Sequence, residues 1–339
     1  MLHWNPMSGQ NYVEYLEKEK EEPVHWRGKS AELLGIEGVE VTRENFALLE
    51  RGIEPIHGEV LRPRERYNLT QDGKIYAHSR VLYEVVIAPP KSVSILSLVD
   101  DRLPTAHKEA LRAISPDMES LALARVRKGG VSENRETGNL LYADWHHKLS
   151  RTLDPQQHTH RIVMNITYDS TEDQWKALKA WDLLKQRHPM TEQYREFLAH
   201  KVESLGYSVE GKQDRQFGWE LSGVSPEVIA KYSQRSEERD EILAEFEEYH
   251  ERPATYKEKI VLMRGNRDEK KYLPAEEAKQ KQMERLTVSE RSSLIRLKEE
   301  SQEKQVSYSW DLNDHITAES ATPYQERWSY GERPKQRAY

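Results

Sequence analysis

The stretch that decides the fold covers residues 142–167 and reads YADWHHKLSRTLDPQQHTHRIVMNIT. Polar and apolar residues alternate over 158–167, which is the pattern of a β-strand with one buried face. Residues 138–145 form a second strand-like run, and Asp154-Pro155 lies in the connection between the two. We therefore expect two neighbouring strands, with the second returning antiparallel to the first.

Further elements are predicted on both sides of these strands. Residues 82–87 (LYEVVI) are rich in β-branched and aromatic side chains, and two prolines end this predicted strand. A helix is expected to begin at Ser225, with Pro226 in its first turn. The remaining predicted helices cover 92–98, 115–127 (stopped by Gly129-Gly130) and 191–205 (closed by Gly206). Strands and helices in this mixture predict an α+β protein.

The composition changes at about residue 237, where Glu, Lys, Arg and Gln become dominant and apolar residues become sparse. Such segments form charged helices with little core of their own, or irregular tails. We therefore expect a domain over 1–240, a charged helical extension over 241–304 and an irregular tail over 305–339.

The composition also limits the chemistry and the location. Of 339 residues, 36% are hydrophobic and 32% are charged, and the mean hydropathy is −0.90. The longest apolar run is far too short to cross a bilayer, and no basic-then-apolar leader opens the chain, so we expect a cytoplasmic protein without a membrane partner. Cysteine is absent, which excludes thiolate nucleophiles and cysteine-bound zinc. A bound metal would need His, Asp or Glu ligands.

The formal net charge of −7 argues mildly against nucleic-acid binding, which usually requires a basic surface. However, the acidic residues cluster over 17–22 and 237–251, whereas basic residues gather elsewhere, at Arg125, Arg127, Lys128, Lys148 and Arg151. The sequence therefore permits a basic groove.

Three histidines carry the chemistry of the central stretch. His158 and His160 are two residues apart, so a strand would present both imidazoles on one face. His147 lies eleven residues before His158, and antiparallel return would bring it opposite the pair. Three neutral imidazoles suit a divalent metal that keeps positions open for substrate oxygens. A His-x-His pair is also a common hydrogen-bonded strand feature, and His146 competes with His147 for the inward-facing position.

The same residues resemble a known family. The pattern His147-x-x-Ser150-Arg151-x-x-Asp154-Pro155-x-x-His158-Thr159-His160 is similar to the three-histidine motif of TrwC-like (MobF-type) conjugative relaxases, in the His-hydrophobic-His endonuclease superfamily. Over residues 1–240 the family's other motifs follow in order, at Trp26-x-Gly28-Lys29-x-Ala31-Glu32-x-Leu34-Gly35, Ala88-Pro89-Pro90-Lys91-Ser92-Val93-Ser94, Trp175-x-Ala177-Leu178, Leu205-Gly206-Tyr207 and Ser233-x-Arg235.

This resemblance implies a fold and an activity. The fold is an antiparallel sheet of about five strands flanked by helices, with a helical C-terminal portion that closes over DNA. The activity is site- and strand-specific nicking and rejoining of DNA at the transfer origin of a plasmid or mobile element. A metal held by His147, His158 and His160 would stabilise charge on the scissile phosphate. A tyrosine would attack this phosphate and form a 5′-phosphotyrosine.

The resemblance also points to further catalytic residues. The nucleophile is expected near the N-terminus, at Tyr15 or Tyr12. Counted from the start of the chain, Tyr15 lies closer to the position of the nucleophile in the family. Asn11-Tyr12, in contrast, matches the local sequence of some members. No tyrosine occurs between Tyr15 and Tyr67, which departs from relatives with a second tyrosine pair. Glu84 stands where relatives commonly have Asp, and would hydrogen-bond a ligating histidine or accept the tyrosine proton.

The cofactor and the partners follow from the same resemblance. Mg²⁺ or Mn²⁺ is the expected metal, and Zn²⁺ or Ni²⁺ could replace it in a crystal. Single-stranded DNA with an origin-of-transfer hairpin is the expected partner of a monomer, together with accessory relaxosome proteins and a coupling protein. The candidate DNA contacts are Arg151, Lys91, Arg27 and Lys29, each of which could also be an ordinary surface or helix-start residue.

Three other functions fit parts of the pattern. A rolling-circle replication initiator shares the histidine pair and the tyrosine chemistry, but its tyrosine usually follows the histidines, as Tyr194 and Tyr207 do here. A DNA-binding module without nicking activity would keep the basic contacts alone. A metal-dependent hydrolase of small molecules would form no covalent DNA adduct.

Overall fold

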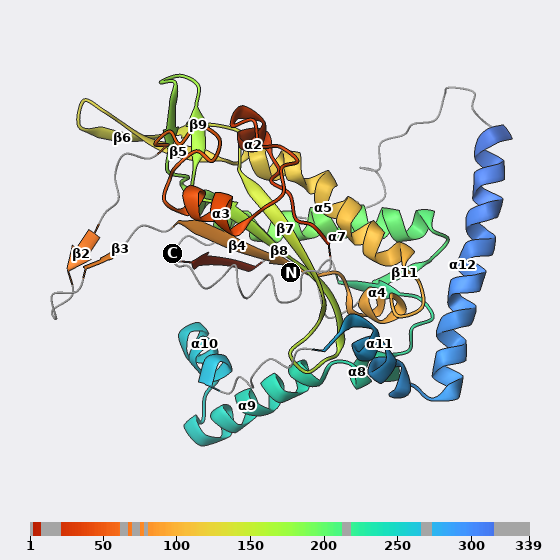
Figure 1. Cartoon of the computed structure of the whole chain (residues 1–339). Coiled ribbons are helices and arrows are strands. Elements are labelled where there is room, and N and C mark those ends of the chain that lie inside the picture. Colours follow the sequence, from red (N-terminus) through yellow and green to blue (C-terminus); the bar gives the residue numbers. More distant parts are fainter. Residues whose placement is uncertain are drawn as a thin grey trace, which may run out of the picture.

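A four-stranded antiparallel sheet forms the centre of the protein, in the order β1-β4-β8-β7 (Figure 1). Its strands are β1 (His3–Met7), β4 (Leu82–Ile87), β7 (Tyr142–Leu149) and β8 (Pro155–Met164). The structure is a computed structural model that describes residues 3–7, 22–61, 67–69, 75–77, 81–211, 218–265 and 273–314. The implied fold class, an antiparallel sheet flanked by helices, is confirmed, with four central strands among these residues.

Short hairpins and a series of helices surround the sheet. The hairpin strands are β2 (Tyr67–Leu69) with β3 (Ile75–Ala77), β5 (Leu123–Lys128) with β6 (Val131–Glu136), β9 (Thr167–Asp169) with β10 (Gln174–Lys176), and β11 (Val209–Gly211) with β12 (Trp219–Leu221). The helices are α2 (Lys29–Leu33), α3 (Arg43–Glu50), α4 (Lys91–Leu96), α5 (Arg102–Ser120), α6 (Ala180–Lys185), α7 (Arg187–Ser204), α8 (Pro226–Lys231), α9 (Gln234–His250), α10 (Tyr256–Gly265), α11 (Ala275–Glu284) and α12 (Val288–Asp314).

One face of the sheet packs against the N-terminal helices α2 and α3. Trp145 of β7 and Ile162 of β8 point to this face and join one apolar cluster with Trp26 and Phe46. Phe46 lies with its ring centroid 5.9 Å from that of Trp26 and 6.4 Å from that of Trp145. Large aromatic side chains contribute much of the burial energy of a core, so this cluster fixes one end of the sheet.

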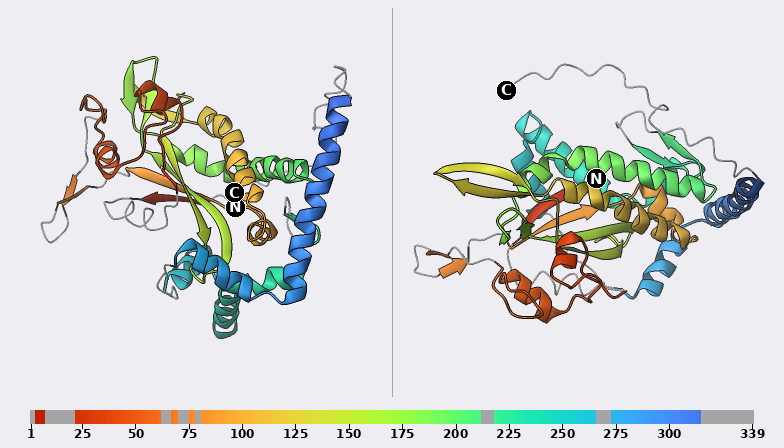
Figure 2. Two further views of the ribbon diagram at one scale, coloured as in Figure 1. Left: turned by 45° about the vertical axis from the view of Figure 1, so that its right-hand side comes forward. Right: turned by 90° about the horizontal axis from the view of Figure 1, so that it is seen from above.

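The opposite face of the sheet is covered by α4, α5 and α7, which pack against residues such as Val85 and Val163. Figure 2 shows α5 and α7 running side by side along this face. Because strand residues alternate between faces, the two clusters divide β8 into two sets. His158, His160 and Ile162 lie on the α2–α3 side, and Thr159 points to the side of α5.

The predicted helix over 115–127 is correct up to Ser120 and wrong beyond it. The structure ends α5 at Ser120 and places Leu123–Lys128 in the strand β5, which pairs with β6 across a turn at Gly129-Gly130. Ala124 and Val126 are buried whereas Arg125 and Arg127 are exposed, which is the two-residue period of a strand. Arg and Ala have high helix propensity, but here pairing with β6 and the burial of Ala124 and Val126 override this preference.

The other predicted elements are present, most of them with shifted ends. The strand over 82–87 is β4 without change, and the predicted strand over 138–145 is β7, which begins four residues later and continues to Leu149. Ser225 caps α8 through a hydrogen bond from the Val228 N–H to its Oγ (3.3 Å), as Pro226 in the first turn predicts. Helix ends depend on such caps.

The charged extension over 241–304 is helical, as its composition predicts. The predicted irregular tail over 305–339 is wrong at its start, because α12 continues to Asp314. Helices α9 and α10 follow α8 and lie below the central sheet in Figure 1, and the residues of α9 are exposed or half-buried. Helix α12 stands at the side of the molecule in both figures. Arg102 fastens this helix to the body through hydrogen bonds to Ser301 Oγ (2.7 Å) and Gln305 Oε1 (2.6 Å). Among the described residues, no helix is both long enough and apolar enough to span a bilayer.

Candidate metal centre

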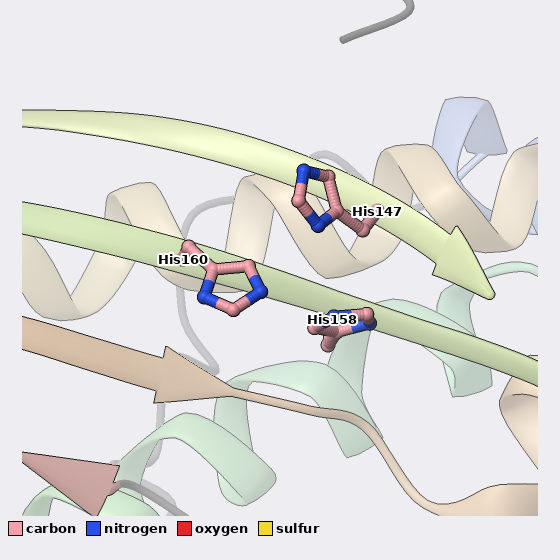
Figure 3. A group of neighbouring side chains, drawn as sticks. All are labelled: His147, His158 and His160. Carbon is pink, nitrogen blue, oxygen red and sulfur yellow. The ribbon is translucent and has the colours of Figure 1, made fainter. Parts of the chain in front are cut away.

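His147, His158 and His160 converge on one point of the α2–α3 face of the sheet (Figure 3). One ring nitrogen of each lies within 4.8 Å of those of the other two, and all three residues are buried. The ring centroids are 4.8 Å apart for His147 and His160, 4.9 Å for His158 and His160, and 5.4 Å for His147 and His158. The juxtaposition expected from the spacing is therefore present.

Strand pairing explains this geometry. His147 of β7 and His158 of β8 are register partners, and Trp145 and Val86 flank His160 on the two neighbouring strands. Directly opposed residues on one sheet face have Cβ atoms about 5 Å apart. The central position of β8 in the sheet therefore holds the histidine pair with another strand on each side.

Two of the rings are oriented by a hydrogen bond from their second nitrogen. His160 Nδ1 bonds Glu84 Oε1 at 2.5 Å, and the side chains of both residues are 9% exposed. His158 Nδ1 bonds the Gln156 carbonyl oxygen at 2.9 Å. Such bonds fix the tautomer and the ring direction of metal-ligating histidines. Glu84 thus occupies one of the two roles expected for it, as the partner of a candidate ligand.

His146 lies on the opposite face of β7 and is separated from the three converging rings. Its Nδ1 bonds Thr159 Oγ1 at 2.7 Å, and His107 Nε2 bonds the same hydroxyl at 2.8 Å. Burial lowers the pKa of His146 to about 4, so this imidazole is neutral at physiological pH. Strand alternation therefore decides between the two neighbouring histidines in favour of His147.

The donor set fits a divalent metal ion. Three buried imidazoles gather, and a carboxylate supports one of them. Three protein nitrogen ligands leave coordination positions for substrate or water oxygens, as in catalytic rather than structural metal sites. The ion that these nitrogens would bind could be any of several divalent metals.

Lys91 and Arg151 lie around the start of β8, near the histidines. Lys91 Nζ donates to the Pro155 carbonyl oxygen at 2.9 Å, and burial lowers the pKa of Lys91 to about 8. Arg151 is half-buried in the turn between β7 and β8. Contact of either residue with DNA stays a prediction.

Arg27 and Lys29 lie at the other end of the sheet. Arg27 pairs through its backbone with Tyr142. Tyr142 precedes His147 by five residues, so about 16 Å of strand separates the two. Arg27 Nη1 forms an ion pair with Glu37 at 3.1 Å, and Lys29 is exposed beside an open cleft of about 610 Å³. Any contact with DNA at this end would be separate from the chemistry at the histidines.

Tyr12 and Tyr15 lie outside the described residues, and the choice between them stays a prediction. The later tyrosines that the replication-initiator alternative would use are buried on the other side of the sheet. The Tyr194 hydroxyl forms a hydrogen bond with His107 Nδ1 (2.5 Å), and Tyr207 donates to Asp100 (2.5 Å). Burial raises the pKa of both phenols, which disfavours the phenolate form.

Reasoning from the sequence missed a buried ion pair behind the histidines. Arg161 Nε and Nη2 each donate to an Asp144 carboxylate oxygen at 2.8 Å, and the guanidinium lies 4.2 Å from the Tyr142 ring centroid. Burial works to raise the pKa of Asp144, but the Arg161 charge and hydrogen bonds hold it below its ordinary value. A charged residue within an apolar strand was the signal that could have revealed this pair.

Comparisons with known proteins show the family of this chain. The family model described as TrwC relaxase matches residues 6–288. The multifunctional conjugation protein TraI of Escherichia coli is 34% identical over 222 residues, which is 62% of this chain and 12% of TraI. The chain therefore corresponds to a small part of the length of this relative.

Solved structures of conjugative relaxase TrwC are similar in fold to this chain. The metal-bound structure of conjugative relaxase TrwC in complex with oriT DNA has a TM-score of 0.71 and 26% identity, and the match covers 84% of this chain and 97% of that chain. TrwC complexed with a 27-mer DNA comprising the recognition hairpin and the cleavage site has a TM-score of 0.70, with the same identity and coverage. The matched family model spans most of the sequence, so the chain belongs to the TrwC relaxase family.

Proposed function

We propose that this chain nicks one strand of DNA at the transfer origin of a plasmid or mobile element and rejoins it after transfer. The observation that carries the proposal is the convergence of His147, His158 and His160, with Glu84 behind His160. Family membership supports the reaction class, because relaxases are DNA-nicking transesterases. The oriT complexes of TrwC support single-stranded DNA with a hairpin as the substrate.

The three imidazoles would hold a divalent cation, Mg²⁺ or Mn²⁺, which supplies charge stabilisation to a phosphate at the site. The chain supplies the orientation of the rings. Glu84 accepts the Nδ1 proton of His160, and the Gln156 carbonyl accepts that of His158. The remaining nitrogen of each of these rings is thereby kept as a lone-pair donor directed to the common point.

The covalent step would use the phenol oxygen of Tyr15 or Tyr12. This oxygen forms a bond to phosphorus, and the bond between phosphorus and the 3′ oxygen breaks. The 3′ oxygen leaves with the electron pair and takes up a proton in place of the one that the phenol loses. The products are a 5′-phosphotyrosine and a free 3′-hydroxyl, and the reverse step rejoins the strand.

Basic side chains would guide the substrate strand. Arg151 lies in the turn that precedes the histidine pair, and Lys91 lies at the N-terminus of α4 beside β8, so phosphates near the scissile bond would meet both. Arg27 and Lys29 would contact a more distant part of the DNA. We further propose a monomer that acts in the cytoplasm with accessory relaxosome proteins and a coupling protein.

The test is a covalent capture experiment. The protein is incubated with Mg²⁺ or Mn²⁺ and a pool of single-stranded oligonucleotides that carry a short hairpin followed by a randomised segment. Adducts that survive SDS are isolated, the DNA is sequenced, and the nucleotidylated peptide is identified by mass spectrometry. We expect the adduct on a peptide that contains Tyr12 and Tyr15.

Substitutions identify the machinery. Tyr15→Phe, Tyr12→Phe and the double variant should locate the nucleophile, and His158→Gln should abolish the adduct. His188→Gln removes an exposed histidine of α7 and serves as the matched control. Adduct formation by the double tyrosine variant would refute the proposal. Binding of the pool without any adduct on the wild-type protein would point to a DNA-binding module instead.

A further inference from the structure

The turn between β7 and β8 is a tight, strained connection directly before the metal-ligating strand. Leu153 has a φ of +61°, and this left-handed conformation costs a non-glycine residue about 1 kcal/mol or more. The Leu153 N–H donates to the Ser150 carbonyl (3.1 Å), and the Asp154 N–H donates to Ser150 Oγ (3.0 Å). A conformation of this kind persists only where surrounding contacts hold it.

Three long side chains from distant parts of the sequence hold three consecutive residues of this turn. Gln282 Nε2 donates to the Leu153 carbonyl oxygen at 2.7 Å. Arg285 Nη1 donates to Asp154 Oδ1 at 2.6 Å, and the Asp154 side chain is 2% exposed. The Pro155 carbonyl oxygen accepts the hydrogen bond from Lys91 Nζ described above.

The constrained segment continues to the first histidine of the pair. The Gln157 N–H donates to Ser94 Oγ, and Gln157 Nε2 donates to Ser97 Oγ, both at 3.0 Å. Between Pro155 and Gln157 lies Gln156, whose carbonyl oxygen orients the His158 ring. A shift of the turn would therefore move the group that sets the direction of a candidate metal ligand.

The helix that supplies two of these side chains is itself fixed. Gln282 is 3% exposed, and Tyr232 donates from its hydroxyl to the Gln282 carbonyl oxygen. The Arg285 guanidinium lies 4.6 Å from the Tyr232 ring centroid, and Nη2 donates to the Lys231 carbonyl oxygen (2.5 Å). Figures 1 and 2 show α11 beside α8 at the end of the long β7–β8 hairpin.

We propose that Gln282 and Arg285 are positioning residues of the metal centre, which hold the β7–β8 turn so that His158 meets His147 and His160. This inference rests on the metal-binding part of the proposed function. It assigns a role to the charged C-terminal helices, which reach the site over a sequence separation of about 130 residues. They act through the backbone of the turn and touch neither the metal nor the DNA in this role.

The physical argument is one of preorganisation. A metal site binds tightly when its ligands already occupy their coordinating positions, because no binding energy is then spent on ordering them. Without Arg285, Asp154 would keep a buried carboxylate without its cationic partner. The turn would relax to lower this cost, and the Gln156 carbonyl and the His158 ring would follow it.

The test measures metal affinity in the full chain, independently of DNA cleavage. Co²⁺ is titrated into wild-type protein, Gln282→Met and Arg285→Met, and the visible absorption of the bound ion reports affinity and coordination geometry. We expect each variant to bind Co²⁺ about 10-fold to 100-fold more weakly, the range found when outer-shell support of a metal ligand is lost. The absorption bands should also change, because His158 would be displaced.

The chain offers matched controls. Gln280→Met removes an exposed glutamine of the same helix, which donates to Glu284 (2.9 Å). Arg291→Met removes a nearby arginine whose described hydrogen bond runs to the Met283 carbonyl oxygen (2.7 Å). Both should bind Co²⁺ as the wild type does. Arg285→Lys keeps a cation beside Asp154 and should restore part of the affinity, even if Arg285→Met folds poorly.

The outcomes separate this inference from the proposed function. Wild-type Co²⁺ affinity and spectrum in Gln282→Met and Arg285→Met, together with a lowered melting temperature, would overturn the inference and leave the proposed nicking function standing. If Arg285→Met does not fold, Gln282→Met alone decides. If the wild-type protein forms no DNA adduct but the variants still bind Co²⁺ more weakly than it does, the proposed function is refuted and the inference is supported.

Discussion

The hydrogen bond between Glu84 and His160 gives the sharpest prediction about the metal centre. Glu84→Gln keeps the size of the side chain and an oxygen that can accept the His160 Nδ1 proton, but removes the negative charge. The bond is 2.5 Å long, and solvent weakens it little because both side chains are 9% exposed. A hydrogen bond to a charged group contributes about 1.5–3 kcal/mol. Loss of the charge should therefore weaken metal binding about 10-fold to 100-fold.

Isothermal titration with Mn²⁺, followed by competition with Mg²⁺, measures this effect. Glu40→Gln is a suitable control, because Glu40 is an exposed glutamate outside the sheet. Wild-type Mn²⁺ affinity in Glu84→Gln would refute a role for the carboxylate in orienting His160. If adduct formation alone were lost, Glu84 would instead be assigned as the acceptor of the tyrosine proton.

Two further predictions concern stability. Burial lowers the pKa of Lys91 from 10.5 to about 8, so between these pH values the unfolded chain holds a proton that the folded protein lacks. The unfolding free energy of the wild type minus that of Lys91→Met should then rise with pH over this range, by up to about 3 kcal/mol. Urea titrations at several pH values measure this difference. A difference that does not change with pH would contradict the buried state of Lys91. Gly28→Ala should destabilise the protein by at least about 2 kcal/mol, because Gly28 has a φ of +97° and a Cβ atom there would lie 2.4 Å from the Leu140 carbonyl oxygen. Gly38→Ala is the control, because Gly38 has a φ of +76° and the space around a new Cβ atom is open. This variant should lose only the free energy that corresponds to backbone strain. Equal losses of unfolding free energy in the two variants would contradict a steric clash at Gly28.

The sequence by itself determined the local part of the site. Alternation along a strand is a property of the backbone, so the two-residue spacing of His158 and His160 was enough to place both rings on one face. The strand over 82–87 and the cap at Ser225 were predictable for the same reason, because β-branched residues and a Ser-Pro helix start act within a few residues of themselves. The order of the matching motifs added the family and its sheet, which periodicity alone does not supply.

The tertiary structure decided everything that depends on which segments meet. Whether His147 or His146 joins the pair follows from the register of β7 on β8, and a shift of one residue would exchange the two. The strand β5 replaces the second half of the predicted helix because pairing with β6 and the burial of alternate side chains outweigh the weak preferences of single residues. Arg285 meets Asp154 only because α8 and α11 fold back onto the turn. Contacts between residues far apart in the sequence leave no local pattern, and so only the folded chain reveals them.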